Sequence, residues 1–404
     1  MKNKSLKHLI VLIACCGMAA SAIGLCINAS GVFYTPVSES LGIGRGTFSL
    51  HMTFFSLMSA FASLVTAKII RRFPLKPVLW VSIVVSAATF VLSALAKEAW
   101  MFYVLSAIRG FFVTLFSSIP LTMLINNWFS KSHGLVTSVV FSFSGIIGSI
   151  FAPLFTSIIT SFGWQAGFVI KGALMMVFCS PALLYPFHMN PRDDGLLPYG
   201  FVEKAEETTT QTTQTKTKFT FIQMSFILFT IFSVLVCSST NLSQHFPGFA
   251  TSIGYDVSVG ATLVSAVMIG NIVSKLVIGA LSDALGAIKA TYTMLGSMFV
   301  GMVLLLLGLN TPMLLAGAFL FGASYSIGAV GIPLLTKHFF GQNNYNTAFP
   351  VITFVNGIGG AISISLIGYI YDIFHSYAMA LYFGLIVAIF GILLIYTLNK
   401  KESN

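Results

Sequence analysis

The sequence predicts an all-α membrane protein, with twelve transmembrane helices arranged in two pseudo-symmetric six-helix bundles. Its 404 residues are 56% hydrophobic and only 8% charged, whereas about a quarter of the residues in an average soluble domain are charged. A motif also repeats, because residues 144–150 read SGIIGSI and residues 356–362, which lie 212 positions later, read NGIGGAI. Residues 40–43 and 252–255 share this offset. Duplicated halves in a membrane are typical of alternating-access transporters.

Twelve apolar stretches reach the length of about 20 residues that a helix needs to cross a bilayer. They divide six and six around a polar segment, so we expect an N-terminal bundle at 1–187, a cytoplasmic linker at 188–219 and a C-terminal bundle at 220–404. The linker contains TTTQTTQTKTK, a composition that cannot build a core, although a regulatory site is the alternative. The first span is too long for a cleaved signal peptide, so we expect a retained helix. In order, the expected spans are 8–35, 46–70, 77–96, 100–125, 134–160, 166–187, 220–245, 256–282, 288–309, 312–336, 346–371 and 377–398.

The distribution of basic residues predicts the topology. If the N-terminus is inside, 16 of the 21 Lys and Arg residues fall in cytoplasmic segments, and only Arg45 and Lys97 fall outside. This asymmetry places both termini in the cytoplasm and the chain in the cytoplasmic (inner) membrane, with its net charge of +10 facing membrane lipid rather than nucleic acid. All five cysteines lie in apolar spans, so we expect no disulfide framework and no metal site. We also expect no cofactor, and a monomer.

Lys275 is the first candidate for substrate binding. It lies in an apolar run, residues 267–281, that is interrupted only by Asn271, Ser274 and glycines. An ionisable residue inside a span costs about 2.5–3.5 kcal/mol on insertion scales, so its presence indicates a function. Asn271 lies one helical turn earlier on the same face, and no acidic residue lies in the central part of any span. We therefore expect an anionic substrate to bind Lys275, with snorkelling toward Asp283 as the alternative.

Five further residues within spans are candidates for supporting roles. Arg109 could orient an anion, relay protons or hold neighbouring helices together, and Lys171 is expected to snorkel toward the outer end of its span. His51 is a candidate for proton coupling, although a hydrogen-bonded packing role is favoured because no acidic residue is placed to tune it. Asn28 and Tyr325 offer neutral hydrogen-bonding groups that can contact substrate or bridge helices.

One loop carries Gly279, Leu281, Asp283, Gly286 and Lys289 in the spacing G-x-L-x-D-x-x-G-x-x-[RK]. With this spacing the loop resembles the signature of the major facilitator superfamily. The resemblance implies a gating role for Asp283, Gly279 and Gly286 at the cytoplasmic side. Asp283 could also cap the start of the next helix, where the backbone donors and the dipole favour an anion. The corresponding loop of the first half departs from the pattern, with Arg in place of Asp and Pro in place of Gly.

The chain further resembles the monocarboxylate transporter and oxalate-formate antiporter branch of that family. In lactate-type members of this branch, the eighth helix carries Asn and Arg four residues apart, and Asn271 and Lys275 stand in those places. Residues 345–371 carry no second basic residue, so we expect a monoanion. Asn28 and Asn271 stand where proton-coupled animal members pair Lys with Asp, so that coupling route is unsupported. The resemblance rests on Asn126–Phe129, Lys131, Gly134, Ser144–Ile146, Phe162–Trp164, Arg192–Gly195 and Pro198–Gly200.

Together these patterns predict a secondary active transporter for a small organic monocarboxylate such as lactate, pyruvate or formate. Lys275 and Asn271 would bind the substrate, and Tyr325, Asn28 and Arg109 would line or support the site. An efflux carrier for an amphipathic drug or metabolite, or a non-transporting membrane sensor, is the alternative. An enzyme is not expected, because no nucleophile constellation or phosphate-binding loop is present.

Overall fold

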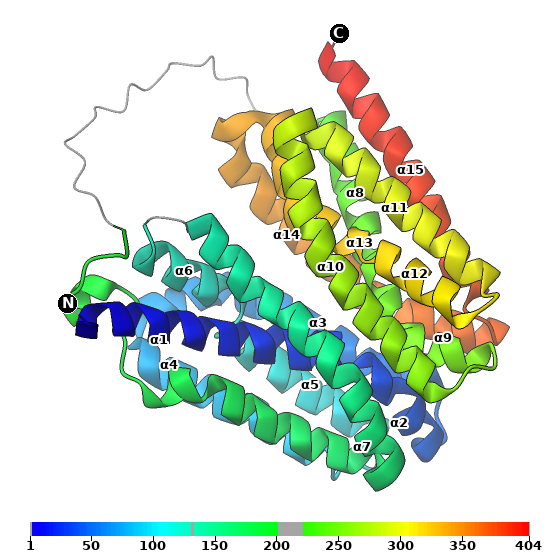
Figure 1. Cartoon of the computed structure of the whole chain (residues 1–404), viewed down its shortest axis with the longest axis horizontal. Coiled ribbons are helices and arrows are strands. Elements are labelled where there is room, and N and C mark those ends of the chain that lie inside the picture. The colour runs from blue at the N-terminus through cyan, green and yellow to red at the C-terminus, as the bar shows by residue number, and fades with distance from the viewer. Residues whose placement is uncertain (1, 131–132, 201–220, 404) are drawn as a thin grey trace.

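The computed structural model describes residues 2–130, 133–200 and 221–403 of the chain. Within these ranges every regular element is helical, and the only strand-like pairing is an isolated bridge between Phe129 and Tyr199. The predicted all-α fold class is therefore confirmed (Figure 1). Most of the expected linker, residues 201–219, lies outside the described residues.

The helices form two groups that lie beside each other (Figure 1). The first group, which we call the N-half, comprises α1 (Lys2–Ala19), η1 (Ala20–Asn28), η2 (Gly31–Phe33), α2 (Tyr34–Leu41), α3 (Arg45–Arg72), α4 (Leu75–Ser93), α5 (Ala99–Thr114), α6 (Ser118–Trp128), α7 (His133–Leu184) and η3 (Pro191–Asp194). The second group, the C-half, comprises α8 (Met224–Thr240), η4 (Asn241–His245), α9 (Phe246–Ser252), α10 (Val257–Leu285), α11 (Ala287–Leu307), α12 (Thr311–Phe321), α13 (Ala323–Ser326), η5 (Ile327–Gly331), α14 (Ile332–Phe374) and α15 (Ala378–Ser403).

Eleven candidate spans in the described part of the chain are long and apolar enough to cross a membrane. The sequence predicts twelve, and the difference lies in α7, where the 46-residue candidate 139–184 is counted once. Gly163 interrupts this helix with φ 83° and ψ 163°, a left-handed region that glycine enters without steric cost. At about 1.5 Å per residue, 46 residues would measure roughly 70 Å, more than twice a bilayer core of about 30 Å. The bend at Gly163 therefore divides α7 into two spans.

The repeated glycine motif lies where the first helix of each half meets the fifth. In the N-half, the Asn28 side chain donates from Nδ2 to the carbonyl oxygen of Ser144 at 2.9 Å. In the C-half, the Asn241 side chain donates from Nδ2 to the carbonyl oxygen of Gly360 at 2.9 Å. A Cβ atom on Gly359 would lie 2.5 Å from the Val234 side chain, so the motif keeps this contact close. The sequence repeat thus corresponds to a repeated helix–helix bond.

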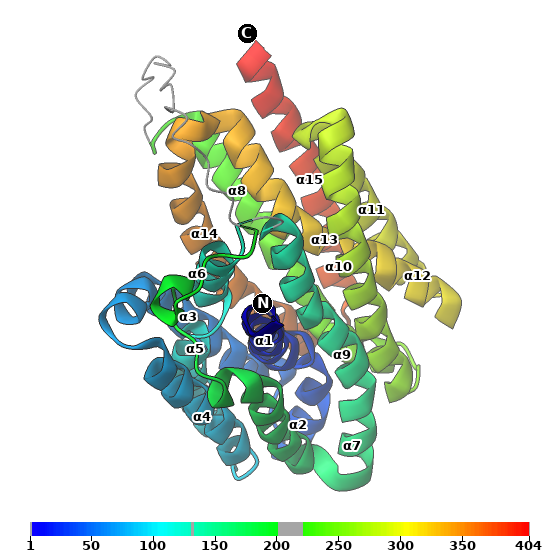
Figure 2. The same ribbon diagram turned by 60° about the vertical axis from the view of Figure 1, so that its left-hand side comes forward.

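The two halves meet at one end and diverge at the other (Figures 1 and 2). The ends that meet carry α2 and α9, and we call this end of the molecule the closed side. The diverging ends carry both chain termini, and we call this end the open side. The halves are thus arranged as in a carrier that exposes its interior to one face of the membrane.

On the open side, residues 188–200 fasten α1 to α6. The Lys7 ammonium donates to the Asp194 carboxylate at 2.7 Å. The indole N–H of Trp128 donates to the carbonyl oxygen of His188 at 3.1 Å, and the backbone N–H of Tyr199 donates to the carbonyl oxygen of Trp128 at 2.8 Å. Two stretches on which the branch resemblance rests, around residues 126–129 and 192–200, therefore contact each other directly.

Candidate functional site

A contact between the halves holds the closed side together. The Asp372 carboxylate, near the end of α14, accepts hydrogen bonds from the backbone N–H groups of Arg45 at 2.9 Å and Gly46 at 2.7 Å. The first N–H groups of a helix have no partner within it, and the helix dipole favours an anion at that end. Asp372 thus supplies to α3 the acceptors that the helix itself lacks. We call this contact the closed-side latch.

The Arg45 side chain and two glycines reinforce the latch. The guanidinium carbon of Arg45 lies 4.1 Å from the centroid of the Tyr371 ring, and its Nη1 donates to the carbonyl oxygen of Gly248 at 3.2 Å. The backbones of α3 and α14 also approach closely, because a Cβ atom on Gly368 would lie 2.7 Å from the Cα of Gly46. A larger residue at Gly368 would push the halves apart here.

A buried aromatic layer lies next to the latch. The Tyr34 hydroxyl of the N-half donates to Oε1 of Gln244 in the C-half at 2.8 Å. The Tyr34 ring packs edge-on against the rings of His51 and His245. Nδ1 of His51 lies 2.7 Å from the carbonyl oxygen of Phe48. His51 therefore has the hydrogen bond and aromatic contacts of a packing residue, and a role in proton coupling stays a prediction.

A cavity of about 690 Å³ adjoins this layer, and Gln244 belongs both to the layer and to the cavity wall. It lies between the halves and extends toward the open side, as far as Leu64 of α3 and Phe349 of α14. No charged side chain is among its described lining residues. They are Ile27, Met52, Phe55, Ser56, Ser59, Ala60, Ser63, Leu64, Thr114, Ser117, Ser118, Ile119, Cys237, Asn241, Gln244, Phe349, Pro350, Thr353, Phe354, Asn356, Gly357, Gly360, Ala361 and Ile364.

The polar groups of the cavity wall come from both halves. In the N-half, the Ser59 and Thr114 hydroxyls lie 2.6 Å apart. In the C-half, Nδ2 of Asn356 donates to the Ser233 hydroxyl at 2.7 Å, while Oδ1 of Asn356 has no hydrogen-bond partner in the described part of the chain. Both halves therefore place neutral polar side chains at the cavity.

Lys275 lies on the face of α10 that contacts the N-half. A Cβ atom on Gly148 would lie 3.1 Å from the Met268 side chain, and one on Gly145 would lie 2.9 Å from the Ile272 side chain. Lys275 follows Ile272 by three residues, so it continues this face by one turn toward the open side. Its ammonium has no hydrogen-bond or ion-pair partner among residues 2–130, 133–200 and 221–403, as the sequence predicts.

The backbone of Asn271 packs against the end of α12. The residue is buried, and a Cβ atom on Gly322 would lie 2.6 Å from its backbone nitrogen. Its Oδ1 atom has no hydrogen-bond partner in the described residues. Asn271 and Lys275 thus lie on one helix within a turn of each other, and neither lines the cavity described above.

The other candidate residues lie around the cavity rather than in its wall. The Tyr325 hydroxyl lies 2.7 Å from the hydroxyl of Ser243, next to the cavity residue Gln244. Asn28 bonds the Ser144 carbonyl and directly follows the lining residue Ile27. These two residues therefore bridge or support helices that form the cavity.

Arg109 lies inside the N-half. Nη2 donates to the Ser106 hydroxyl at 2.7 Å, and the guanidinium carbon lies 4.1 Å from the centroid of the Phe90 ring. Nε and Nη1 are buried without a hydrogen-bond partner in the described residues. The contacts of Arg109 join α5 to α4, so they support the bundle and do not reach the cavity wall.

Lys171 does not snorkel, so that prediction was wrong. Its side chain is 1% exposed, and the ammonium donates to the Ser30 hydroxyl at 3.1 Å. The ammonium lies 4.4 Å from the ring centroid of Phe33 and 5.6 Å from that of Phe155. Aromatic faces attract a cation, and these faces hold the ammonium in the bundle instead of letting it reach the membrane surface.

The side chain of Asp283, in the signature loop on the open side, is exposed and makes no hydrogen bond or ion pair within the described ranges. Gly286, with φ 87°, precedes α11, and no side chain caps that helix start, so the expected cap by Asp283 is not present. Nothing lies within 4 Å of a Cβ atom built on Gly279. The gating role of these residues stays a prediction.

Two groups of residues at the candidate site were not predicted from the sequence. One is the latch, Arg45 and Asp372, whose partners lie in different halves and share no local pattern. The other is the set of amides around the cavity, Asn241, Gln244 and Asn356. Asn356 begins the repeated motif NGIGGAI, and Asn241 lies 213 residues after Asn28, close to the repeat offset of 212. The repeat could therefore have indicated Asn356 and Asn241 as candidates.

Comparison with known proteins decides the family. The family model of the Major Facilitator Superfamily matches residues 10–364 and 228–404. The chain belongs to the major facilitator superfamily. This membership makes it a multi-pass membrane transporter rather than an enzyme, and it accounts for the two halves and the cavity between them.

Individual members of the superfamily resemble the chain at low identity. It is 27% identical over 315 residues to the uncharacterised MFS-type transporter YhjX of Escherichia coli (strain K12), covering 75% of this chain and 74% of YhjX. It is 23% identical over 284 residues to monocarboxylate transporter 12 of Mus musculus, covering 65% of this chain and 58% of that protein. The crystal structure of the nucleoside transporter NupG superposes with a TM-score of 0.73 at 13% identity, covering 98% of this chain and 99% of NupG. These similarities support the fold and the family and leave the substrate open.

Proposed function

We propose that this transporter moves a small organic monocarboxylate across the cytoplasmic membrane by alternating access. The observation that carries the proposal is the Lys275 ammonium, which is unpaired in the described residues and lies on the α10 face toward the N-half. Removing a cation from water without a partner is costly. A substrate carboxylate would supply the missing charge, and the Asn271 side chain, four residues earlier on α10, would hydrogen-bond it.

The small number of available cations supports a monoanion over a dianion. Lys275 lies outside the cavity wall, whose described residues carry no charge, and the other buried cations, Arg109 and Lys171, contact aromatic rings within the N-half. One carboxylate can therefore be neutralised at Lys275, while a second would stay uncompensated in a low-dielectric site. The name of the relative monocarboxylate transporter 12 agrees with this substrate class.

The arrangement of the halves supports a place in the transport cycle. The positive-inside asymmetry indicates that the open side faces the cytoplasm. Substrate would then exchange with the cytoplasm in the present conformation, while the latch at Asp372 seals the outside. Rocking of the halves would break the latch and close the open side. Asp283 would then take part in the closed contact on that side.

Uptake into proteoliposomes tests the proposal. Radiolabelled lactate, pyruvate and formate are supplied with and without a pH gradient to the wild type, Lys275→Gln, Lys275→Arg and Lys400→Gln. Lys400 is an exposed residue near the end of α15, so Lys400→Gln is the control that removes one positive charge elsewhere. We expect saturable uptake that Lys275→Gln abolishes, Lys275→Arg retains in part and Lys400→Gln leaves intact. Full uptake by Lys275→Gln would refute the assignment of Lys275, and no uptake of any acid by folded wild type would refute the substrate class.

The uncharged cavity favours one second candidate, an efflux carrier for an amphipathic neutral solute. Met52, Phe55, Phe349 and Phe354 supply apolar surface, and the amides of the wall supply hydrogen bonds. Such a solute would not need Lys275. Transport of an uncharged amphipathic dye that is equal in the wild type and Lys275→Gln would support this candidate over the monocarboxylate.

A further inference from the structure

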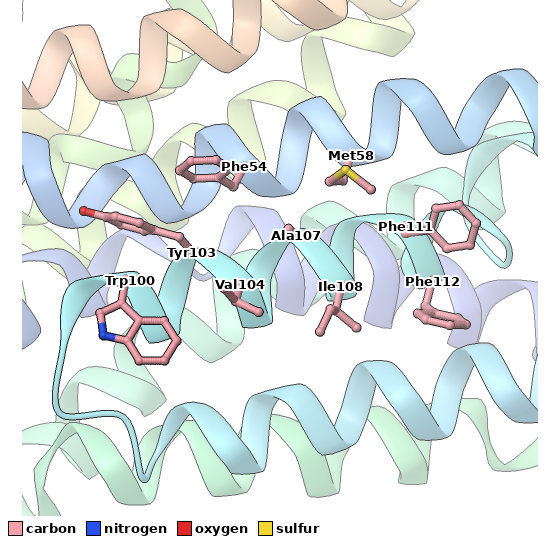
Figure 3. Close-up of a pocket in the computed structure, with 9 residues that line it drawn as sticks. All are labelled: Phe54, Met58, Trp100, Tyr103, Val104, Ala107, Ile108, Phe111 and Phe112. Carbon is pink, nitrogen blue, oxygen red and sulfur yellow. The ribbon is translucent and has the colours of Figure 1, made fainter.

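A second cavity lies on the outer face of the N-half, along α5 and beside α3 (Figure 3). Its volume is about 570 Å³. We call it the α5 groove. Two rows of α5 side chains form it, one on each side of the helix, and α3 contributes two side chains above them (Figure 3). The lining residues are Phe54, Met58, Trp100, Tyr103, Val104, Ala107, Ile108, Phe111 and Phe112.

The groove has a narrow floor between two aromatic ends. At one end the rings of Tyr103 and Phe54 stack with centroids 5.3 Å apart, and at the other end the rings of Phe111 and Phe112 lie 5.4 Å apart. Ala107 stands between these pairs and has only a methyl group (Figure 3). The hollow therefore exists because a small residue interrupts a row of large ones.

The groove faces the membrane. It lies on the candidate span 99–128, and Trp100 and Val104 are 61% and 49% exposed. From Trp100 to Phe112 the helix rises about 18 Å at ~1.5 Å per residue. One leaflet of hydrocarbon is about 15 Å deep, half of a ~30 Å core. The groove thus matches the length of one acyl chain in one leaflet.

The end of the groove on the closed side has the features of a membrane interface. Trp100 and Tyr103 lie at the start of α5, and amphipathic aromatic side chains are enriched at this depth. Lys97 is exposed three residues before Trp100, where a cation can attract a lipid phosphate. The groove is thus apolar along its length, and the charged residues Lys97 and Glu98 lie just beyond its closed-side end, in the same order as the chain and headgroup of a phospholipid.

We propose that the α5 groove is a binding site for one glycerophospholipid of the closed-side leaflet, with an acyl chain over Ala107 and the phosphate near Lys97. A second copy of the chain fits less well, because helices that pack against each other in lipid use small residues for close approach. The groove has one small residue, Ala107, between bulky rims. A flexible acyl chain can enter between such rims where a helix cannot.

Native mass spectrometry of the whole protein, purified with its membrane lipid, tests the site. Ala107→Phe fills the floor, and Ala88→Phe is a matched control because Ala88 is exposed on the neighbouring helix α4. After bulk lipid is removed, we expect one retained phospholipid on the wild type and Ala88→Phe, and at least ~10-fold less on Ala107→Phe. Equal retention by all three proteins, or none by the wild type, would overturn the proposal. A lipid-free dimer that Ala107→Phe disrupts would overturn it in favour of a second copy.

A fluorescence titration tests the groove without filling it. The contribution of Trp100 is the difference between the wild type and Trp100→Phe in detergent micelles. We expect a phospholipid with dibrominated chains to quench this contribution saturably, near one lipid per protein. Quenching that grows without saturation, or is absent, would contradict a defined site even if Ala107→Phe fails to fold.

Discussion

The closed-side latch makes a quantitative prediction for Asp372→Asn. In the wild type, the carboxylate accepts two backbone hydrogen bonds, at 2.9 Å from Arg45 and at 2.7 Å from Gly46. An Asn side chain keeps one acceptor oxygen, loses the other and carries no charge. The variant therefore loses one charge-assisted hydrogen bond and the favourable interaction of the carboxylate with the start of α3.

The size of the loss follows from these two terms. A hydrogen bond to a charged group contributes about 1.5–3 kcal/mol, and a charge at a helix end contributes about 0.3–1 kcal/mol. Water that enters the opened gate hydrates both partners, so we take about 2 kcal/mol as the net destabilisation of the closed state. At about 1.4 kcal/mol per factor of ten, the equilibrium shifts ~30-fold toward opening on this side.

Thiol accessibility measures this shift. Ile364 lines the cavity behind the latch, so Ile364→Cys in a background without the five native cysteines reports opening to a membrane-impermeant thiol reagent added on the closed side. We expect Asp372→Asn to raise the labelling rate ~30-fold. Glu39→Gln, which removes an exposed acid of α2 on the same side, should change it less than about 2-fold. Equal rates for the two variants would refute the latch.

Three further outcomes follow from contacts inside the halves. Asn241→Ala removes two hydrogen bonds from η4 to α14, those to the Gly360 carbonyl and the Ser363 hydroxyl, and should lower the free energy of unfolding by about 1–3 kcal/mol, measured by denaturant titration in detergent. Lys171→Met replaces a buried cation by an apolar side chain of similar length, and should leave uptake intact and keep or raise the melting temperature. For Asp194, burial raises the carboxyl pKa, but hydrogen bonds from Lys7 and His188 outweigh it and leave the pKa below its usual value. Asp194→Asn should therefore cost about 1 kcal/mol at pH 7, and the difference from the wild type should begin to shrink near the usual carboxyl pKa of about 4 and vanish once the pH has fallen through the lower pKa of the folded state.

The fold could be predicted from the sequence because its signals are local. Hydropathy marks each span, and the repeat of SGIIGSI as NGIGGAI marks the halves. The lack of an acidic partner for Lys275 could be predicted for the same reason, since a lysine without a nearby acid is visible in one span. Its ammonium is unpaired in the described residues, and its role in substrate binding stays a prediction.

The missed features depend on distant contacts. The latch joins residues 327 positions apart, and neither Arg45 nor Asp372 has an unusual neighbourhood in the sequence. Lys171 was wrongly expected to snorkel because its position near a span end is local information, whereas the rings that surround it come from η2, from α4 and from the part of α7 on the other side of the bend at Gly163. Only packing of the whole N-half brings Phe33, Phe90 and Phe155 to one ammonium.

The paired bonds from Asn28 to Ser144 and from Asn241 to Gly360 have a mechanical meaning. Each bond joins the first helix of a half to the fifth helix of the same half, so it does not have to break when one half moves against the other. The contacts that such a motion would change are those between the halves, along α3 and α14 and along α7 and α10. Glycines such as Gly368 and Gly145 let the helices approach closely at both contacts. If each half moves as a rigid body, we expect the strength of these two contacts to set the balance between its open and closed states.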